Sequence, residues 1–154
     1  MTQVGAKLAM RRSVWIEADV ERIWKEFETA DGMKGWWETG TASTQRVERF
    51  EPGEGGWFEI AGTHGSFDYR LGGQILEWDP PSKLVMEWDS LPAGEWPAPL
   101  TVTIMLTAHL GGTVVEIVQS GFEGLGAAAT RVLNSFEAGW DVTELLALKR
   151  RVEA

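Results

Sequence analysis

Few side chains in this sequence could act as nucleophiles or metal ligands. There are two histidines, His64 and His109, and no cysteine. The histidine spacing matches neither an HExxH motif nor a Cys/His cluster, and no serine stands in a GxSxG nucleophile elbow. His64 lies between glycines in a turn, and His109 falls on the polar face of an expected strand. We therefore expect no metal ion, no cofactor and no nucleophilic catalysis.

General acid–base chemistry would need a carboxyl or phenol group that faces an apolar interior, because burial there raises the pKa of a carboxyl group toward neutrality. The candidates lie along the expected strands: Asp68, Tyr69, Glu77, Glu87 and Glu116. Side chains alternate between the two faces of a strand. If Met86 and Trp88 face inward, Glu87 faces outward, and the same rule sends Glu116 outward. We therefore assign no catalytic residue.

Gln119 is the polar side chain best placed to meet a ligand. In "TVVEIVQS", Val115, Ile117 and Gln119 share one face, and the first two are apolar. An amide on that face could orient a bound molecule by hydrogen bonding. Alternatively, Gln119 lies near the end of its strand and contacts water. Both interpretations stay open at the level of sequence.

The first part of the chain reads as a strand followed by two short helices. Residues 8–16 alternate between apolar and other side chains, interrupted by Arg12. Residues 20–27 have helical apolar spacing behind an N-cap at Asp19. Residues 29–39 form a second short helix, ended by Gly40. Its adjacent Trp36 and Trp37 point about 100° apart, so we expect Trp36 inside and Trp37 at the rim.

The remaining sequence predicts six strands and a long helix. Between residues 43 and 121, runs of strand length are separated by turn signals such as "DPPS" at 79–82 and "LGGT" at 110–113. Consecutive hairpins favour an antiparallel meander. Strong helix formers after Gly126 predict a helix of some 25 residues. Its apolar stripe changes direction, so the helix is expected to bend near Gly139 or to change the surface on which it packs.

Composition restricts the class of protein. The 154 residues suit one domain over residues 1–154, and no apolar run is long enough to span a membrane. A net charge of −9 disfavours nucleic acid as a partner. The absence of cysteine and of a secretory signal indicates the cytoplasm. The basic run "KRR" at 149–151 is expected to complement the dipole at the end of the last helix.

Four segments in this order resemble one known family: "VWIEADVERIWKEFETADGMKGWW", "FEPGEGGWFEI", "GGQILEWDPPSKLVMEW", and "TVVEIVQSGF" followed by "GWDVTELLALK". They resemble the SRPBCC or START-like superfamily, and within it the homologues of the activator of the heat-shock-protein-90 ATPase. The resemblance implies an α+β helix-grip fold like that of the birch-pollen allergen. In that fold a curved antiparallel sheet of six or seven strands, two short helices and a long C-terminal helix enclose a potential cavity. One departure is Glu144, where the family usually has leucine, four residues after Trp140.

The resemblance also implies a function, namely binding of a small hydrophobic or aromatic molecule without catalysis. Alternatives are a cyclase-, aromatase- or hydrolase-like enzyme that uses the same cavity, and a chaperone-regulating interaction protein. The expected ligand-binding residues are Trp36, Phe58, Tyr69, Trp78, Met86, Trp88, Ile104, Leu106, Gln119, Phe136 and Trp140.

Three further tryptophans face outward in this interpretation: Trp15, Trp57 and Trp96. They could form an exposed aromatic patch suited to a homodimer, or they could be shielded by loops.

Overall fold

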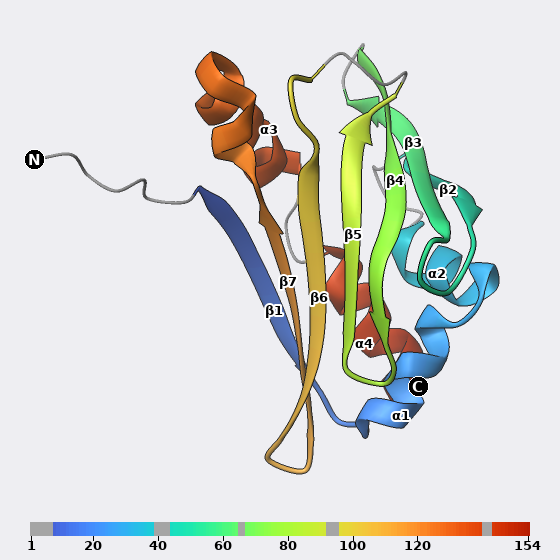
Figure 1. The fold of residues 1–154 in the computed structure, drawn as a ribbon. Coiled ribbons are helices and arrows are strands. Elements are labelled where there is room, and N and C mark those ends of the chain that lie inside the picture. The colour runs from blue at the N-terminus through green and yellow to red at the C-terminus, as the bar shows by residue number, and fades with distance from the viewer. Residues whose placement is uncertain (1–7, 39–43, 65–66, 92–95, 140–142) are drawn as a thin grey trace, which may run out of the picture.

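The chain forms one curved, seven-stranded antiparallel sheet whose inner face is covered by helices (Figure 1). The structure is a computed structural model that describes residues 8–38, 44–64, 67–91, 96–139 and 143–154. The sheet order is β1-β7-β6-β5-β4-β3-β2. The strands are β1 (Ala9–Ile16), β2 (Arg46–Phe50), β3 (Trp57–His64), β4 (Phe67–Asp79), β5 (Lys83–Ser90), β6 (Leu100–His109) and β7 (Gly112–Ser120). The α+β fold class and the six-strand meander are confirmed.

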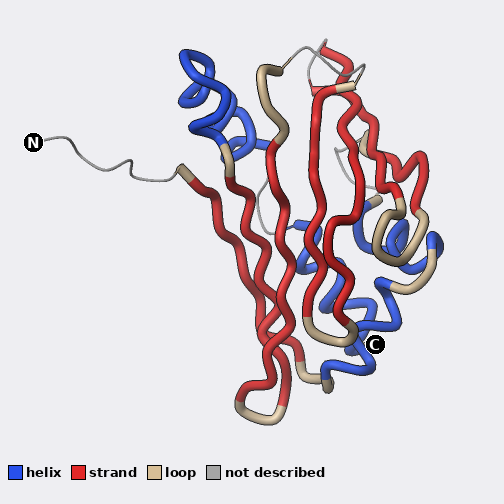
Figure 2. Tube along the Cα trace, in the orientation of Figure 1, coloured by secondary structure: helices blue, strands red, loops and turns tan. Residues whose placement is uncertain are grey.

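The helices fall into two groups, one before β2 and one after β7 (Figure 2). The first group is α1 (Val20–Trp24), the 3-10 turn η1 (Lys25–Phe27) and α2 (Ala30–Trp37). The second is η2 (Phe122–Ala128), α3 (Ala129–Gly139) and α4 (Thr143–Glu153). The expected 25-residue helix is therefore two helices. α3 ends at Gly139, where the sequence predicted a bend, and residues 140–142 lie outside the described residues.

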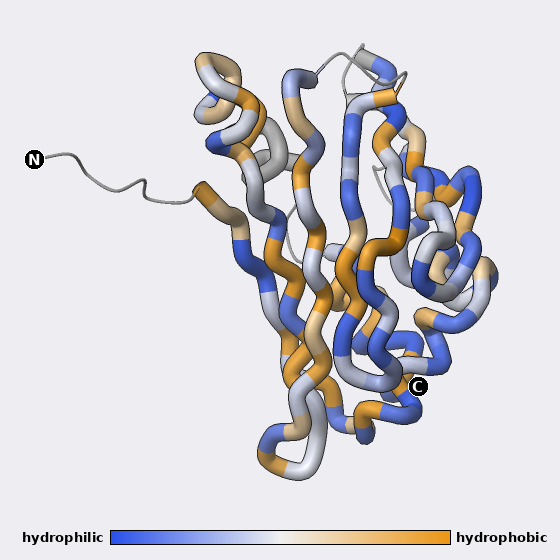
Figure 3. The backbone as a smooth tube through the Cα atoms, viewed as in Figure 1, coloured by the Kyte–Doolittle hydropathy of each residue, from blue (hydrophilic) through white to orange (hydrophobic). Residues whose placement is uncertain are grey.

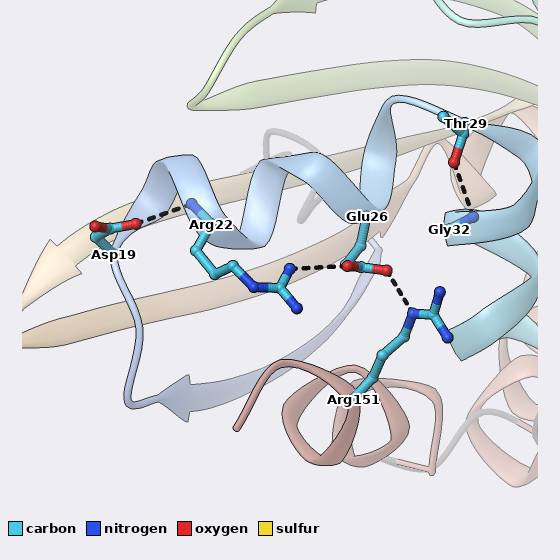
Figure 4. Close-up of polar contacts among 6 residues, drawn as sticks. All are labelled: Asp19, Arg22, Glu26, Thr29, Gly32 and Arg151. Carbon is cyan, nitrogen blue, oxygen red and sulfur yellow. Dashed lines mark hydrogen bonds and ion pairs between the residues drawn. The ribbon is translucent and has the colours of Figure 1, made fainter. Parts of the chain in front are cut away.

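Local sequence explains where the short helices begin. The Asp19 carboxylate accepts a hydrogen bond from the Arg22 amide at 2.9 Å, which confirms it as the N-cap of α1. The Thr29 hydroxyl does the same for α2 by accepting from the Gly32 amide at 3.0 Å (Figure 4). α2 ends at Trp37, and Gly40, its expected end, lies outside the described residues.

Hydrophobic and hydrophilic residues alternate along the strands (Figure 3), and this alternation gives the sheet a dry inner face and a wetter outer face. In β6, Leu100, Val102 and Ile104 are fully buried, while Thr101 and Thr103 between them are partly exposed. The same alternation runs through β1, β5 and β7. Burial of this face supplies the apolar area that drives folding.

The prediction that Trp37 lies at a rim is wrong, because Trp36 and Trp37 are both buried, with exposures of 0% and 1%. The reason is that α2 contacts β2 and α4. A helix covered on more than one side can bury two side chains that point about 100° apart.

The predicted patch of outward tryptophans is not formed by Trp15 and Trp57. Trp15 lies on the edge strand β1, while Trp57 lies on β3, near the other edge in the strand order. The Trp15 indole donates to the His109 carbonyl at 2.8 Å, and the Lys149 ammonium lies 5.4 Å from its ring. Arg49 lies 5.8 Å from the Trp57 ring. Each ring is thus held by its own neighbours.

An ion-pair network ties the first helices to the last one. Glu26 accepts hydrogen bonds from Arg22, at 2.8 Å, and from Arg151 of α4 (Figure 4). The exposed fraction of Glu26 is 8%. Burial works to raise the pKa of Glu26, but hydrogen bonds and charge from Arg151 and Arg22 outweigh it, so the pKa lies below its usual value. The sequence placed the 149–151 cations only at a helix end; Arg151 in fact joins two distant segments.

Two glycines of α2 leave room for this contact. A Cβ added to Gly35 would lie 2.5 Å from the Arg151 guanidinium carbon, so the guanidinium packs directly against the helix backbone. A Cβ added to Gly32 would lie 2.6 Å from the backbone carbonyl oxygen of Glu26. The first neighbour is the end of a flexible side chain, whereas the second is fixed backbone.

The Glu26 network should stabilise the protein in a pH-dependent way. Because the pKa of Glu26 is lower in the folded chain, its contribution is present above its usual pKa of 4.5 and is lost as the pH falls through the folded value. We expect Glu26→Gln to lower the free energy of unfolding by about 1–2 kcal/mol at pH 7, since both guanidinium groups are partly exposed. Urea unfolding from pH 7 to pH 3 should show this difference shrinking below pH 4.5. The exposed Glu28→Gln is the control, and an equal effect of both variants would contradict the assignment.

The two glycines provide a matched pair. Gly32→Ala should cost about 1–3 kcal/mol, because the backbone must move to admit the methyl group. Gly35→Ala should change stability by less than about 1 kcal/mol, since a gain in helix propensity offsets displacement of Arg151. Thermal and urea unfolding would measure both variants. If Gly35→Ala lost as much free energy of unfolding as Gly32→Ala, the Arg151 side chain would be unable to move aside, which would contradict this prediction.

Candidate functional site

The inner face of the sheet carries one polar side chain in the middle of an apolar row. The strand register places the row's members side by side across five strands: Met10, Gln119, Val102, Met86 and Ile75. All five are buried, with exposed fractions of 1% or less. Cross-strand neighbours of this kind lie about 4.5–5.5 Å apart at Cβ. Gln119 therefore has apolar side chains on both sides.

Gln119 has no hydrogen-bond partner for its amide. Its exposed fraction is 0%, and within the described part of the chain neither Oε1 nor Nε2 is paired. The interpretation in which Gln119 contacts water at a strand end is excluded, because its exposed fraction is 0%. A buried, unpaired polar group costs about 1–3 kcal/mol, so such groups are rare in folded proteins. The amide can donate and accept, and it is available to a bound molecule.

The predicted tryptophan and phenylalanine ligand residues pack mainly against one another. Ring centroids lie 5.0 Å apart for Trp36 and Trp37, 5.2 Å for Trp37 and Phe58, and 6.1 Å for Phe58 and Trp88. The network continues through Phe27 and Trp24 to the half-buried Trp78. We call these seven residues the aromatic wall. It fills the interior beneath α1 and α2.

The other predicted ligand residues divide into two groups. Met86, Ile104 and Leu106 are buried on the inner face as expected. The side chain of Phe136 and all of Trp140 lie outside the described residues, as does the side chain of His64. His109 is exposed, as its strand position predicted.

Tyr69 belongs to a separate polar cluster on the inner side of β4. Its hydroxyl donates to the Gln45 side-chain oxygen at 3.0 Å, and the Gln45 amide donates to the Trp37 carbonyl at 3.1 Å. A Cβ at Gly62 would lie 2.7 Å from the Tyr69 hydroxyl, so the glycine admits the ring. Burial, together with the negative charge of Glu144, raises the pKa of Tyr69. Tyr69 thus stays neutral and connects β4 to the end of α2.

Glu144 is a buried carboxyl group that the sequence did not identify as a site residue. It lies in the first turn of α4 with an exposed fraction of 8%. One sequence feature did point to Glu144, namely that the family usually has leucine at this position. The acid–base candidates, however, were inferred from strand alternation, which does not apply to a residue on a helix. A negative charge at a helix N-terminus is favourable, which accounts for its tolerance there.

The other acid–base candidates face away from the interior. Asp68 and Glu77 are exposed, and Glu77 pairs with Lys83 at 3.0 Å. Glu116 lies on the outer face and pairs with Arg11 at 3.6 Å. In the described ranges, His, Asp and Glu side chains nowhere gather in threes that could hold a metal ion.

A hollow of about 620 Å³ lies over β2, β3, β4 and the end of β5. The cross-strand row Arg46, Ala61 and Arg70 crosses it, and Arg70 pairs with Glu59 at 3.4 Å. This row is on the side opposite Phe58 and Ile60. Tyr69, a predicted ligand residue on the inner side of β4, also lines the hollow, whereas Gln119 lies on the distant strand β7. The two arginines of the hollow are paired with carboxylates of the chain.

Arg12 is the residue that interrupts the alternation of apolar and polar side chains along β1, and it lies at an inner-face position. Its register partner is Ile117, so Arg12 shares the inner-face line with Met10 and stands diagonally across from Gln119. It is partly buried, and its guanidinium donates to the Arg11 carbonyl at 2.8 Å. Within the described residues Arg12 pairs with no carboxylate. α3 and α4 both contact β1, the strand that carries it.

Comparison with known proteins agrees with this architecture. The chain is similar to protein Ms6760 of Mycobacterium smegmatis, with 18% identity, a TM-score of 0.74, and coverage of 94% of this chain and 88% of that one. Protein CV1439 of Chromobacterium violaceum gives 21% identity, a TM-score of 0.71, and coverage of 95% and 97%. The AHSA1-like protein of Aeromonas hydrophila gives 20% identity, a TM-score of 0.64, and coverage of 95% and 92%.

No curated protein matches the sequence. No helix in the described ranges is both long and apolar enough to cross a membrane. A family model described as activator of Hsp90 ATPase homolog 1-like protein matches residues 17–152, which is most of the chain. The resemblance seen in four sequence segments is therefore confirmed, and the chain belongs to the family of activator of Hsp90 ATPase homologue 1-like proteins.

Proposed function

We propose that this protein binds a small, largely apolar molecule on the inner face of its sheet, without catalysing a reaction, and that Gln119 hydrogen-bonds to the polar group of that molecule. The observation that carries the proposal is the fully buried Gln119 amide, neither atom of which is paired with any described residue. A protein gains nothing in stability from such a group, so a ligand partner is the simplest reason to keep it.

The surroundings of Gln119 support an apolar ligand. Its register neighbours Met10 and Val102 present only apolar side-chain atoms, and Met86 extends the same row. Sites of this kind combine an apolar lining with a few placed polar groups. The family fold, a sheet closed by helices, is compatible with such binding.

The Tyr69 cluster gives less support to an enzyme. A general acid must reach the substrate with its proton, whereas the Tyr69 hydroxyl already donates to Gln45. The raised pKa of Tyr69 also disfavours its action as a base near neutral pH. We therefore retain ligand binding as the conclusion.

Binding can be tested with two ligands of nearly equal shape, 2-acetylnaphthalene and 2-ethylnaphthalene, titrated while tryptophan fluorescence is followed. The wild type should bind both saturably and the ketone roughly fivefold more tightly, because one neutral hydrogen bond contributes about 1 kcal/mol. Gln119→Met should remove this preference. Gln74→Met, on an exposed position of β4, is the control and should keep it.

The two possible failures are separate. Absence of saturable binding by both naphthalenes would refute the proposed function. Saturable binding with the same preference in wild type and Gln119→Met would refute only the role of Gln119.

The same variants make a stability prediction. Gln119→Met replaces an unpaired buried amide with an apolar side chain of similar length, so the ligand-free protein should become about 1–2 kcal/mol more stable. Gln74→Met should change the free energy of unfolding by less than about 0.5 kcal/mol. Urea unfolding of the three proteins measures this. A destabilised Gln119→Met protein would mean that the amide contributes to the fold.

A further inference from the structure

Arg12 differs from the other arginines of the sheet. The described strands contain five arginines, and four of them pair with a carboxylate: Arg11, Arg46, Arg49 and Arg70. Among the described residues, the guanidinium of Arg12 pairs with the Arg11 carbonyl and with no carboxylate. The sequence holds 23 acidic residues against 14 basic ones, so acidic partners are plentiful. Without an acidic partner among the described residues, this inner-face arginine is available to an anion from outside the chain.

Arg12 and Gln119 occupy diagonal positions on the same face. Arg12 pairs in register with Ile117, and Gln119 is the next inward residue of β7. Diagonal cross-strand neighbours are about 7–8 Å apart, within reach of long side chains. Arg12 lies on the edge strand and is partly exposed, whereas Gln119 is one strand further in and dry. The pair therefore leads from the edge of the sheet into the interior.

We infer that the ligand is a monocarboxylic acid with an apolar tail, its ionised carboxylate held by the Arg12 guanidinium and the Gln119 Nε2–H group. This inference rests on the proposed function and specifies its ligand class. Guanidinium and carboxylate form charge-assisted hydrogen bonds, which are stronger than neutral ones. Gln119 Oε1 then remains free to accept from a ligand hydroxyl or from water.

The strand register of the inner face indicates where the apolar tail of the ligand would lie and how long it would be. From Gln119 the inner-face row continues through Val102 to Met86, two strand spacings or roughly 10 Å away. Trp88 lies on the same face as Met86 and belongs to the aromatic wall. An extended alkyl chain or a compact ring system would lie along this row and end against the wall. A medium-chain acid matches that length.

The hollow over β2, β3 and β4 carries no comparable inference. Its arginines are paired with carboxylates, and Asp68 and Glu59 also line it. The local charge is balanced without any ligand.

The test compares decanoate with methyl decanoate, both below the concentration at which micelles form, by tryptophan fluorescence and by displacement of 2-acetylnaphthalene. Wild type should bind decanoate about tenfold more tightly than the ester, and added salt should reduce this difference. Arg12→Gln should weaken decanoate binding about tenfold and leave binding of the ester unchanged. Arg12→Lys keeps the charge and should recover part of the loss.

Arg11→Gln is the matched control, because it removes the same charge one residue away on the opposite face. It should change decanoate binding by less than twofold. Urea unfolding of each variant confirms that the fold persists, and Arg12→Lys serves as the informative variant should Arg12→Gln not fold.

Three outcomes would overturn the inference: equal affinity for acid and ester, equal effects of Arg12→Gln and Arg11→Gln, or no recovery by Arg12→Lys. In those cases saturable binding of 2-acetylnaphthalene leaves the proposed function standing. If neither naphthalene ligand, the ester nor the acid binds, the proposed function fails together with the inference.

Discussion

The structure depends on covering the apolar inner face of a strongly curved sheet. At one end α2 inserts Trp36 and Trp37 between the sheet and the last helix, and their rings contact Phe27, Phe58 and Trp88. Aromatic side chains bury large areas and pack edge to face or tilted, so a few of them can fill a wide space. This wall fixes where the short helices lie, and it leaves the remaining inner face to be covered by α3 and α4.

The polar groups of the interior are distributed unevenly, and this follows from the wall. Gln119 and Arg12 lie on β7 and β1, away from the rings, where the helices after β7 provide the cover. Tyr69 is satisfied by Gln45 at the other side of the sheet. Paired polar groups stabilise a fold, whereas unpaired buried ones cost free energy unless a bound molecule supplies the partner. Among the described residues, the indole N–H groups of Trp24, Trp36 and Trp88 are also buried and unpaired, but each is a single donor, whereas Gln119 leaves both a donor and an acceptor unpaired.

The position of α4 over the sheet is fixed by contacts between segments that are far apart in the sequence. Glu26 receives Arg151 from the last helix, while the Lys149 ammonium donates to the Trp15 carbonyl at 2.8 Å. Gly35 permits the first contact because it lacks a side chain. Thus α4 is held against η1, α2 and β1, and its position is set by these polar contacts as well as by apolar packing.

The sequence by itself determined the strands, the hairpins, the N-cap at Asp19 and the inward direction of Gln119, because alternation, turn residues and capping are local properties. The tertiary structure alone decided that Trp37 is buried with Trp36, that Glu144 is buried, and that Gln119 is dry and unpaired among the described residues. Each of these depends on which distant segment covers the residue, and no local pattern records that. The position of Arg12 needed both sequence and structure. The sequence showed that Arg12 interrupts the apolar alternation of its strand, and the strand register showed that it lies diagonally across from Gln119.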